Sequence, residues 1–277
     1  MRGNLVKVAG RVAIVTGGGG GIGGAIAERL AENGAKVMVA DLDPNAAASV
    51  ADGINARYPG SALAEGADVA NVDHIRRIIE HAEAEFGCVD LYFANAGVGG
   101  ALGLEASDAD WDHVLDVNVR AHIRAAQQLV PKWLERGEGY FVTTASAAGL
   151  LTQIGSATYS VTKHAAVGFA EWLSVTYGDQ GIGVSCLCPM GVDTAMLYAG
   201  RDSGDPRGVA ATQAVTSAGE VLQPAQVADV VLDAVEREAF LILPHEQVLA
   251  MFQQKGADYD RWIRGMRRYQ GALLGQG

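Results

Sequence analysis

Residues 12–41 read VAIVTGGGGGIGGAIAERLAENGAKVMVAD, and this stretch decides the fold. Its first five residues are apolar and mostly β-branched, which predicts a buried strand. Five glycines follow, then a helical pattern that ends at Asn33-Gly34, and a second strand that ends on Asp41. Glycines let the backbone come close to a pyrophosphate, and the N-terminus of the following helix offers free N–H groups to its phosphates. An acidic residue about 20 positions after the glycines accepts a hydrogen bond from a ribose hydroxyl. The stretch therefore predicts a dinucleotide site rather than an ordinary glycine-rich turn.

Size and composition are typical of one globular α/β domain. The chain has 277 residues, of which 49% are hydrophobic and 19% are charged, so we expect residues 1–277 to form a single domain. The net charge of −11 argues against nucleic acid or an anionic membrane as a partner. The apolar stretches are strand-sized, which argues against a transmembrane helix. Residues 1–4 carry no signal peptide, so we expect a cytoplasmic protein.

The three cysteines, Cys88, Cys186 and Cys188, are expected to be free thiols in a reducing cytosol. Cys186 and Cys188 lie along a predicted strand and are expected to face opposite sides of it. No histidine lies at ligand spacing from them. We therefore expect no metal site.

Strands alternate with helices along nearly the whole chain. This alternation predicts an α/β protein with a three-layer, doubly wound Rossmann fold and a seven-stranded parallel sheet, in which ligands bind at the carboxyl ends of the strands. The stretch 195–222 has no clear periodicity and is expected to be a substrate lid, and 244–277 is expected to be a C-terminal helical tail. Beyond the opening stretch, strands are expected at 61–66, 89–94, 139–145, 184–188 and 240–243, and helices at 44–57, 72–86, 107–135, 155–177 and 224–238.

Three polar residues near the expected strand ends can carry chemistry: Ser146, Tyr159 and Lys163. Tyr159 and Lys163 lie one helical turn apart on one face. A tyrosine has a pKa of about 10, and an ammonium about 4 Å away could lower it by roughly 3 units. Ser146 could hydrogen-bond the same substrate oxygen. On spacing alone, a surface aromatic and a solvated charge remain an alternative interpretation.

Over residues 10–195 the sequence resembles the short-chain dehydrogenases/reductases, and its motifs occur in family order. Thr16-Gly17, Gly21 and Gly23 resemble the TGxxxGxG cofactor turn, and the catalytic tetrad corresponds to Asn118, Ser146, Tyr159 and Lys163. The resemblance implies that Tyr159 is the general acid/base, that Lys163 lowers its pKa and binds the nicotinamide ribose, that Ser146 polarises the substrate oxygen, and that Asn118 holds a water. It implies cofactor contacts from Gly17, Gly21, Ile22, Gly23, Asp41, Leu42, Asp68, Val69, Asn95, Ala96, Gly97, Tyr159, Lys163, Pro189, Gly191, Val192 and Thr194.

Two departures from the family pattern concern the end of the sixth strand and the tail. The usual Pro-Gly pair is here Pro189-Met190-Gly191, so the inserted Met190 leaves the nicotinamide contacts of this loop open. The C-terminus also lacks the glycine-ended signature of many members. The tail is therefore expected to be an amphipathic helix packed on its own subunit or on a neighbour.

The cofactor choice follows from Asp41. Its carboxylate is expected to accept hydrogen bonds from the adenosine ribose and to repel a 2′-phosphate. The positions at which the family places a basic residue for that phosphate are Gly18 and Leu42, and neither is basic. We therefore expect NAD(H) rather than NADP(H).

Together these features predict an NAD(H)-dependent oxidoreductase that interconverts a secondary alcohol and a ketone. No arginine or lysine lies in 98–106 or 147–156, which favours an apolar, uncharged substrate, although Arg201 and Arg207 in the lid weaken this inference. A reductase of a thioester-bound or sugar-like carbonyl is the alternative enzyme, and a dinucleotide-binding regulator without catalysis is the alternative of another class. The family resemblance implies a homo-oligomer, with a tetramer favoured, through apolar faces of the helices at 107–135 and 155–177.

Overall fold

A computed structural model describes residues 7–275 of the chain. Residues 1–4, in which we expect no signal peptide, lie outside this range. Seven parallel strands form one sheet in the order β3-β2-β1-β4-β5-β6-β7, which confirms the predicted doubly wound sheet. The strands are β1 (Val12–Thr16), β2 (Lys36–Asp41), β3 (Ala62–Gly66), β4 (Leu91–Ala94), β5 (Gly139–Thr144), β6 (Ile182–Leu187) and β7 (Leu241–Ile242).

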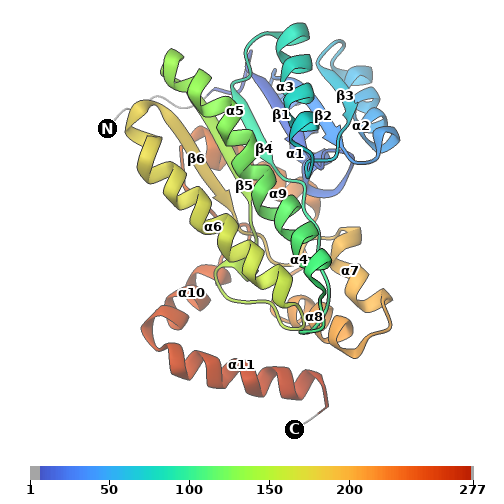
Figure 1. The fold of residues 1–277 in the computed structure, drawn as a ribbon, viewed down its shortest axis with the longest axis vertical. Helices are drawn as coiled ribbons and strands as arrows, with labels where there is room; N and C mark the ends of the chain where they lie inside the picture. Colours follow the sequence, from blue (N-terminus) through green and yellow to red (C-terminus); the bar gives the residue numbers. More distant parts are fainter. Residues whose placement is uncertain (1–6, 276–277) are drawn as a thin grey trace.

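Helices cover both faces of this sheet (Figure 1). Helices α3, α5 and α6 pack on one face, and α1, α2 and α9 pack on the other. The helices that make up these layers are α1 (Gly21–Glu32), α2 (Pro44–Arg57), α3 (Val72–Phe86), α4 (Asp108–Leu115), α5 (Ala121–Arg136), α6 (Ala157–Tyr177) and α9 (Pro224–Glu236). Short helical turns are η1 (Asp116–Arg120), η2 (Ala147–Gly149) and η3 (Gly178–Gln180).

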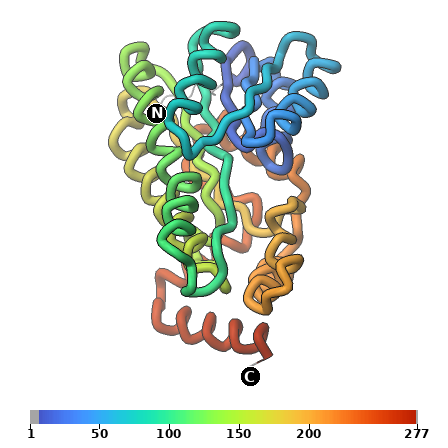
Figure 2. Tube along the Cα trace, turned by 45° about the vertical axis from the view of Figure 1, so that its right-hand side comes forward, coloured from blue at the N-terminus to red at the C-terminus, as the bar shows by residue number. Residues whose placement is uncertain are grey.

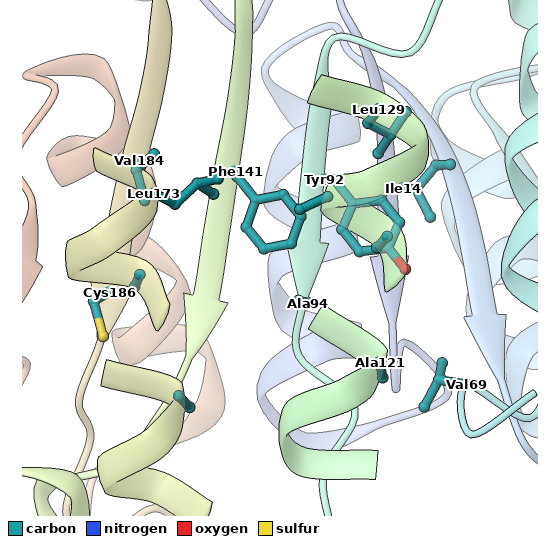
Figure 3. Packing of buried hydrophobic residues seen from close by; sticks show 14 of the residues in the cluster. Ile14, Val69, Tyr92, Ala94, Ala121, Leu129, Phe141, Leu173, Val184 and Cys186 are labelled. Carbon is teal, nitrogen blue, oxygen red and sulfur yellow. The ribbon is translucent and has the colours of Figure 1, made fainter. Parts of the chain in front are cut away.

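The two core clusters follow from the period of two along each strand. Ile14 of β1 packs against α3 and α5, whereas Ala13 and Val15 face α1 on the other side. Figure 3 shows the first cluster, in which the rings of Tyr92 and Phe141 stack with centroids 5.4 Å apart. Because both faces of every central strand are buried, these strands are apolar at nearly every position.

The strand order reverses at β1, which lies between β2 and β4. Strands β2 and β3 lie on one side of β1, and strands β4 to β7 lie on the other side. Loops that follow β1 and β4 therefore diverge and leave a crevice at their carboxyl ends, where doubly wound folds bind ligands. Because the strands are parallel, the loops that follow them all lie at this end of the sheet.

Two expected elements differ from the sequence prediction. The stretch 107–135 is not one α-helix, because the five-residue π-helical turn η1 separates α4 from α5. The stretch 195–222 is not a plain loop, because it contains α7 (Ala195–Asp202) and α8 (Pro206–Thr216). Pro206 begins α8 with Asp205 as its N-cap, a start signal that weak hydrophobic periodicity obscured.

The orientation expected for the paired cysteines is wrong. The Sγ atoms of Cys186 and Cys188 lie 3.8 Å apart, since residues two apart in an extended chain point to the same face. Both thiols are buried beneath α6.

The C-terminal tail forms two helices, α10 (Gln247–Ala257) and α11 (Tyr259–Leu273). Figure 2 shows α11, in red, crossing the end of the molecule at which the α7–α8 segment lies. The Tyr269 hydroxyl donates to the carbonyl of Ala214 in α8, which ties the tail to the α7–α8 segment. Within residues 7–275, no helix combines the length and the hydrophobicity needed to cross a bilayer.

Candidate active site

In the glycine turn after β1, the backbone is packed so closely at several positions that a side chain would not fit. Gly17 has φ +62°, and a Cβ on Gly23 would collide with the carbonyl oxygen of Gly17. Helix α1 begins at Gly21-Ile22 with no side-chain cap and no acidic residue in its first turn. Its first N–H groups and the positive end of its dipole are thus left for an anion, as a pyrophosphate site requires.

Asp41 lies at the end of β2 with its carboxylate against this turn. Its Oδ2 accepts a hydrogen bond from the N–H of Gly19 at 2.9 Å, and its Oδ1 accepts one from the N–H of Asp43 at 3.0 Å. The next residue, Leu42, is 75% exposed and points its side chain away from the core. Backbone N–H groups therefore hold the Asp41 carboxylate beside the glycine turn. Its neighbours in the sequence, Ala40 and Leu42, are both uncharged.

Two further loops border the crevice. Asp68 accepts a hydrogen bond from the N–H of Ala70, and Val69 beside it is buried. The Asn95 amide donates to the carbonyls of Thr16 and Gly17 at 3.0 and 3.2 Å, and its oxygen accepts from the Thr144 hydroxyl. Because every polar group of this side chain is used, Asn95 holds three strand ends together and shapes the turn that it follows.

Ser146, Tyr159 and Lys163 come together at the carboxyl end of β5. Ser146 follows β5, and its hydroxyl accepts from the N–H of Ala148 at 3.1 Å and lies 3.4 Å from the carbonyl oxygen of Pro189. Tyr159 and Lys163 both belong to α6, and the Lys163 Nζ lies 5.6 Å from the centre of the Tyr159 ring. That ammonium donates to the carbonyl of Thr144 at 3.0 Å. The alternative of a surface aromatic and a solvated charge is excluded, since Lys163 is buried and Tyr159 is half-buried.

The pKa values of this group differ from the sequence expectation. Burial raises the pKa of Tyr159 above its ordinary value of 10, and the hydrogen bond to Ser146 opposes that rise. Burial also lowers the pKa of Lys163 to about 8. Burial thus opposes the lowering of the Tyr159 pKa that is expected from Lys163, because loss of water around the phenolate disfavours its charged form.

Asn118 lies in the middle of the π-helical turn η1, and its side chain is fully engaged. Its Oδ1 accepts from the N–H of Val98 and its Nδ2 donates to the carbonyl of Val98, both at 2.9 Å. The same Nδ2 donates to the Thr162 hydroxyl at 3.1 Å. The amide joins the loop after β4 to α6, and Gly97 of that loop packs against both Asn118 and Lys163. Single-turn π-helices are frequent at functional sites.

The loop after β6 closes the crevice from the other side. The Pro189 carbonyl accepts from the N–H of Ala147 at 2.8 Å, and Gly191 accepts from the N–H of Leu222 at 2.9 Å. Val192 is buried, and the methyl group of Thr194 lies against Gly21 at the start of α1. The structure thus brings the expected 189–194 contacts next to both the glycine turn and Ser146.

The two arginines of the α7–α8 segment are paired with carboxylates. Arg207 in α8 lies 2.7 Å from Glu105 and 2.8 Å from Asp205, and Arg201 in α7 lies 2.8 Å from Asp202. Leu150, Leu151 and Ile154, which follow Ser146 in the chain, are buried. These three residues after Ser146 are thus apolar and buried, and both arginines of the α7–α8 segment have counter-ions.

The structure adds residues to the site that sequence reasoning missed. Lys255 of α10 is buried and donates to the carbonyl of Leu150 at 2.6 Å. His245, just after β7, contacts the backbone of the 189–191 loop. His122, one turn after Asn118, has both ring nitrogens buried without a protein partner, and burial next to the Lys163 charge lowers its pKa to about 3. No motif marks these three, and Lys255 and His245 reach this region only through the folded chain.

The residues present can bind an anionic dinucleotide along the glycine turn and move a proton at the Tyr159 hydroxyl. No cluster of three or more histidine, cysteine, aspartate or glutamate side chains suited to a metal ion occurs between residues 7 and 275. The arrangement therefore corresponds to proton transfer beside a bound dinucleotide.

Comparison with known proteins gives consistent findings. The family model described as short chain dehydrogenase matches residues 11–203. Cyclohexanol dehydrogenase of Acinetobacter sp. (strain SE19) is 35% identical over 189 residues, which cover 68% of this chain and 75% of that protein. A short chain dehydrogenase/reductase from Burkholderia phymatum in complex with NAD superposes with a TM-score of 0.83 at 32% identity, covering 92% of this chain and 96% of that one. L-sorbose reductase from Gluconobacter frateurii, complexed with NADPH and L-sorbose, has a TM-score of 0.76 at 25% identity, covering 85% and 95%.

Proposed function

We propose that the cofactor of this protein is NAD(H) and that its substrate is an apolar secondary alcohol or the corresponding ketone. The chain belongs to the short-chain dehydrogenase family. It transfers hydride between a nicotinamide dinucleotide and an alcohol or ketone. One observation carries the cofactor choice: the Asp41 carboxylate held against the glycine turn by the N–H groups of Gly19 and Asp43. A 2′-phosphate brought to this position would meet a fixed negative charge. The adjoining Gly18 and Leu42 offer no cation to offset it.

Tyr159 is the general acid/base of the proposed reaction. In oxidation it takes the proton of the substrate hydroxyl, and in reduction it returns a proton to the carbonyl oxygen. Ser146 donates to the same substrate oxygen and fixes it beside the phenol. Lys163 stabilises the phenolate and binds the ribose next to the nicotinamide, which accepts or supplies the hydride when the dinucleotide is bound. The pKa of Lys163, about 8, leaves it mostly charged at neutral pH.

Asn118 supports this proton path through its position. Its amide is bonded to Val98 and Thr162, so the side chain holds the loop after β4 against α6, beside Lys163, and we propose that the relay water lies at this junction. The remaining cofactor contacts fall to the backbone and small side chains around the crevice: Gly17, Gly21, Ile22, Gly23, Asp68, Val69, Asn95, Ala96, Gly97, Pro189, Gly191, Val192 and Thr194.

The substrate class follows from the lining of the site. Leu150, Leu151 and Ile154 follow Ser146 in the chain and are apolar, and Arg201 and Arg207 of the proposed lid are paired with carboxylates of the same region. A carboxylated or phosphorylated substrate would find no free cation in the lid and would lose hydration without compensation. The similarity to a cyclohexanol dehydrogenase supports the same choice, since cyclohexanol is an uncharged alicyclic alcohol.

We further propose that the enzyme is a cytoplasmic homo-oligomer, most simply a tetramer. Helix α6 exposes large apolar side chains, with Val175 at 87% and Trp172 at 54% of their full exposure. Trp172 also stacks with Phe169 and contacts Tyr177, so the exposed surface is continuous and aromatic. A two-fold pairing of α6 with its copy would bury this surface.

The experiment that tests the proposal is a comparison of kcat/KM for NAD⁺ and NADP⁺ with a panel of apolar secondary alcohols, including cyclohexanol. We expect turnover with at least one of these alcohols and a preference for NAD⁺ of roughly a hundredfold or more, from lost hydrogen bonds and charge repulsion at Asp41. Equal values, or a preference for NADP⁺, would contradict the assignment of Asp41. Turnover confined to sugars or acyl thioesters would contradict the apolar substrate.

A further inference from the structure

His245 lies just after β7, where the C-terminal tail leaves the sheet, and its ring is buried with 3% exposure. The ring contacts two successive residues of the loop after β6. Its Nδ1 accepts a hydrogen bond from the N–H of Met190 at 3.2 Å, and its Nε2 lies 3.0 Å from the carbonyl oxygen of Gly191. One side chain thus satisfies a backbone donor and a backbone acceptor of the same loop.

These two contacts define the state of the ring. Because the Met190 N–H can only donate, Nδ1 must be unprotonated, and Nε2 must carry the hydrogen that it donates to Gly191. Burial lowers the pKa of His245, while the backbone of Gly191 and the backbone and charge of Glu220 oppose that change. A neutral imidazole with one fixed tautomer is a stiff connector between the start of the tail and the loop.

The loop that His245 holds reads Pro189-Met190-Gly191, and His245 contacts both Met190 and Gly191. On the other side of Met190, the Pro189 carbonyl accepts from the N–H of Ala147 and from the Ser146 hydroxyl at 2.8 and 3.4 Å. The loop is therefore fixed at one end to the segment that carries Ser146 and at the other end to His245. Without His245, the Met190 N–H would lose its protein acceptor.

We propose that His245 is a positioning residue that holds the 189–191 loop in the shape that receives the nicotinamide end of the cofactor. This inference rests on the proposed function, because it assumes that a dinucleotide lies with its nicotinamide against this loop. The adenosine half of the cofactor would be held by the glycine turn and Asp41, whereas the His245 ring contacts Met190 and Gly191. Loss of His245 should therefore weaken binding of the nicotinamide half of the cofactor and leave binding of the adenosine half unchanged.

The test uses two matched variants, His245→Phe and His245→Gln. His245→Phe keeps a planar ring but removes both hydrogen bonds, whereas His245→Gln replaces the ring with an amide that offers one acceptor and one donor. Dissociation constants are measured by isothermal titration for NADH and for ADP-ribose, which lacks the nicotinamide. We expect His245→Phe to weaken NADH binding by about tenfold, as the loss of one or two buried hydrogen bonds implies, and to leave ADP-ribose within twofold. His245→Gln is expected to retain most of the NADH affinity.

The matched control is His113→Ala, an exposed histidine of α4 away from the loop, which is expected to change neither constant. Should His245→Phe fail to fold, His245→Ala gives the same readout without added bulk. Equal weakening of NADH and ADP-ribose, or unchanged NADH binding in His245→Phe, would overturn the inference, as would a His245→Gln variant as impaired as His245→Phe. A wild-type protein that prefers NADPH contradicts the cofactor choice alone, and the same variants then test His245 with NADPH and 2′-phospho-ADP-ribose.

Discussion

Replacing Lys163 with methionine is expected to abolish turnover and yet to stabilise the folded protein. Lys163 is buried, and its pKa of about 8 lies well below the ordinary value of 10.5. Each pKa unit corresponds to about 1.4 kcal/mol, so burying this ammonium costs on the order of 3 kcal/mol at pH 7. The methionine variant loses the hydrogen bond to the Thr144 carbonyl, worth about 1 kcal/mol. We therefore expect a net stabilisation of about 2 kcal/mol.

The pH dependence of this effect gives a stricter test. Because the pKa of Lys163 is lower in the folded state, the unfolded chain binds more protons between pH 8 and about 10.5, so wild-type stability rises with pH relative to the variant. The advantage of Lys163→Met is expected to shrink by about 1 kcal/mol between pH 7 and pH 9.

The free energies of unfolding are measured by urea denaturation at equal protein concentration at pH 7 and pH 9. Lys132→Met, which replaces an exposed lysine paired with Glu83, serves as the control and is expected to change stability by less than about 1 kcal/mol at either pH. A Lys163→Met variant less stable than wild type at pH 7, or an advantage that does not fall at pH 9, would refute the reasoning from burial.

Three further predictions concern the cofactor turn and the assembly. Asp41→Ala is expected to narrow the preference for NAD(H) chiefly by raising the KM for NAD⁺, and an unchanged ratio of kcat/KM for the two cofactors would contradict the role of this carboxylate. Gly23→Ala is expected to abolish dinucleotide binding in fluorescence titrations, because its Cβ would collide with the Gly17 carbonyl, and near-normal binding would show that the turn can open. Trp172→Glu is expected to reduce the mass measured by light scattering at micromolar concentration, because it charges the exposed face of α6, and a wild-type monomer would remove the proposed oligomer altogether.

Much of the fold could be predicted from the sequence, because the signals are local. The strand from Val12 to Thr16, the glycines after it and the acid at position 41 all depend on neighbouring residues. Alternation of strands and helices then predicts a parallel sheet, because each helix returns the chain to the edge at which the previous strand began. The right-handedness of such crossovers decides on which face of the sheet each helix lies. The predicted seven-stranded parallel sheet is confirmed, and the structure adds its strand order about β1.

What the sequence did not yield depends on contacts between distant residues. The π-helical turn around Asn118 breaks a helix whose apolar pattern is continuous, and it exists together with hydrogen bonds to Val98 and Thr162. His245 and Lys255 reach the site from the tail, where no family motif marks them. The raised pKa of Tyr159 likewise reflects burial, which no spacing between residues reports.

The central claim is that Tyr159 transfers the proton in a reaction whose hydride passes to or from NAD(H). The most direct measurement compares Tyr159→Phe with wild type, following NADH absorbance during oxidation of the best alcohol and measuring NADH binding separately. We predict that kcat falls by at least a hundredfold while the NADH dissociation constant stays within about twofold, because the change removes one hydroxyl and keeps the ring. A variant that keeps more than about a tenth of the wild-type kcat would contradict the claim.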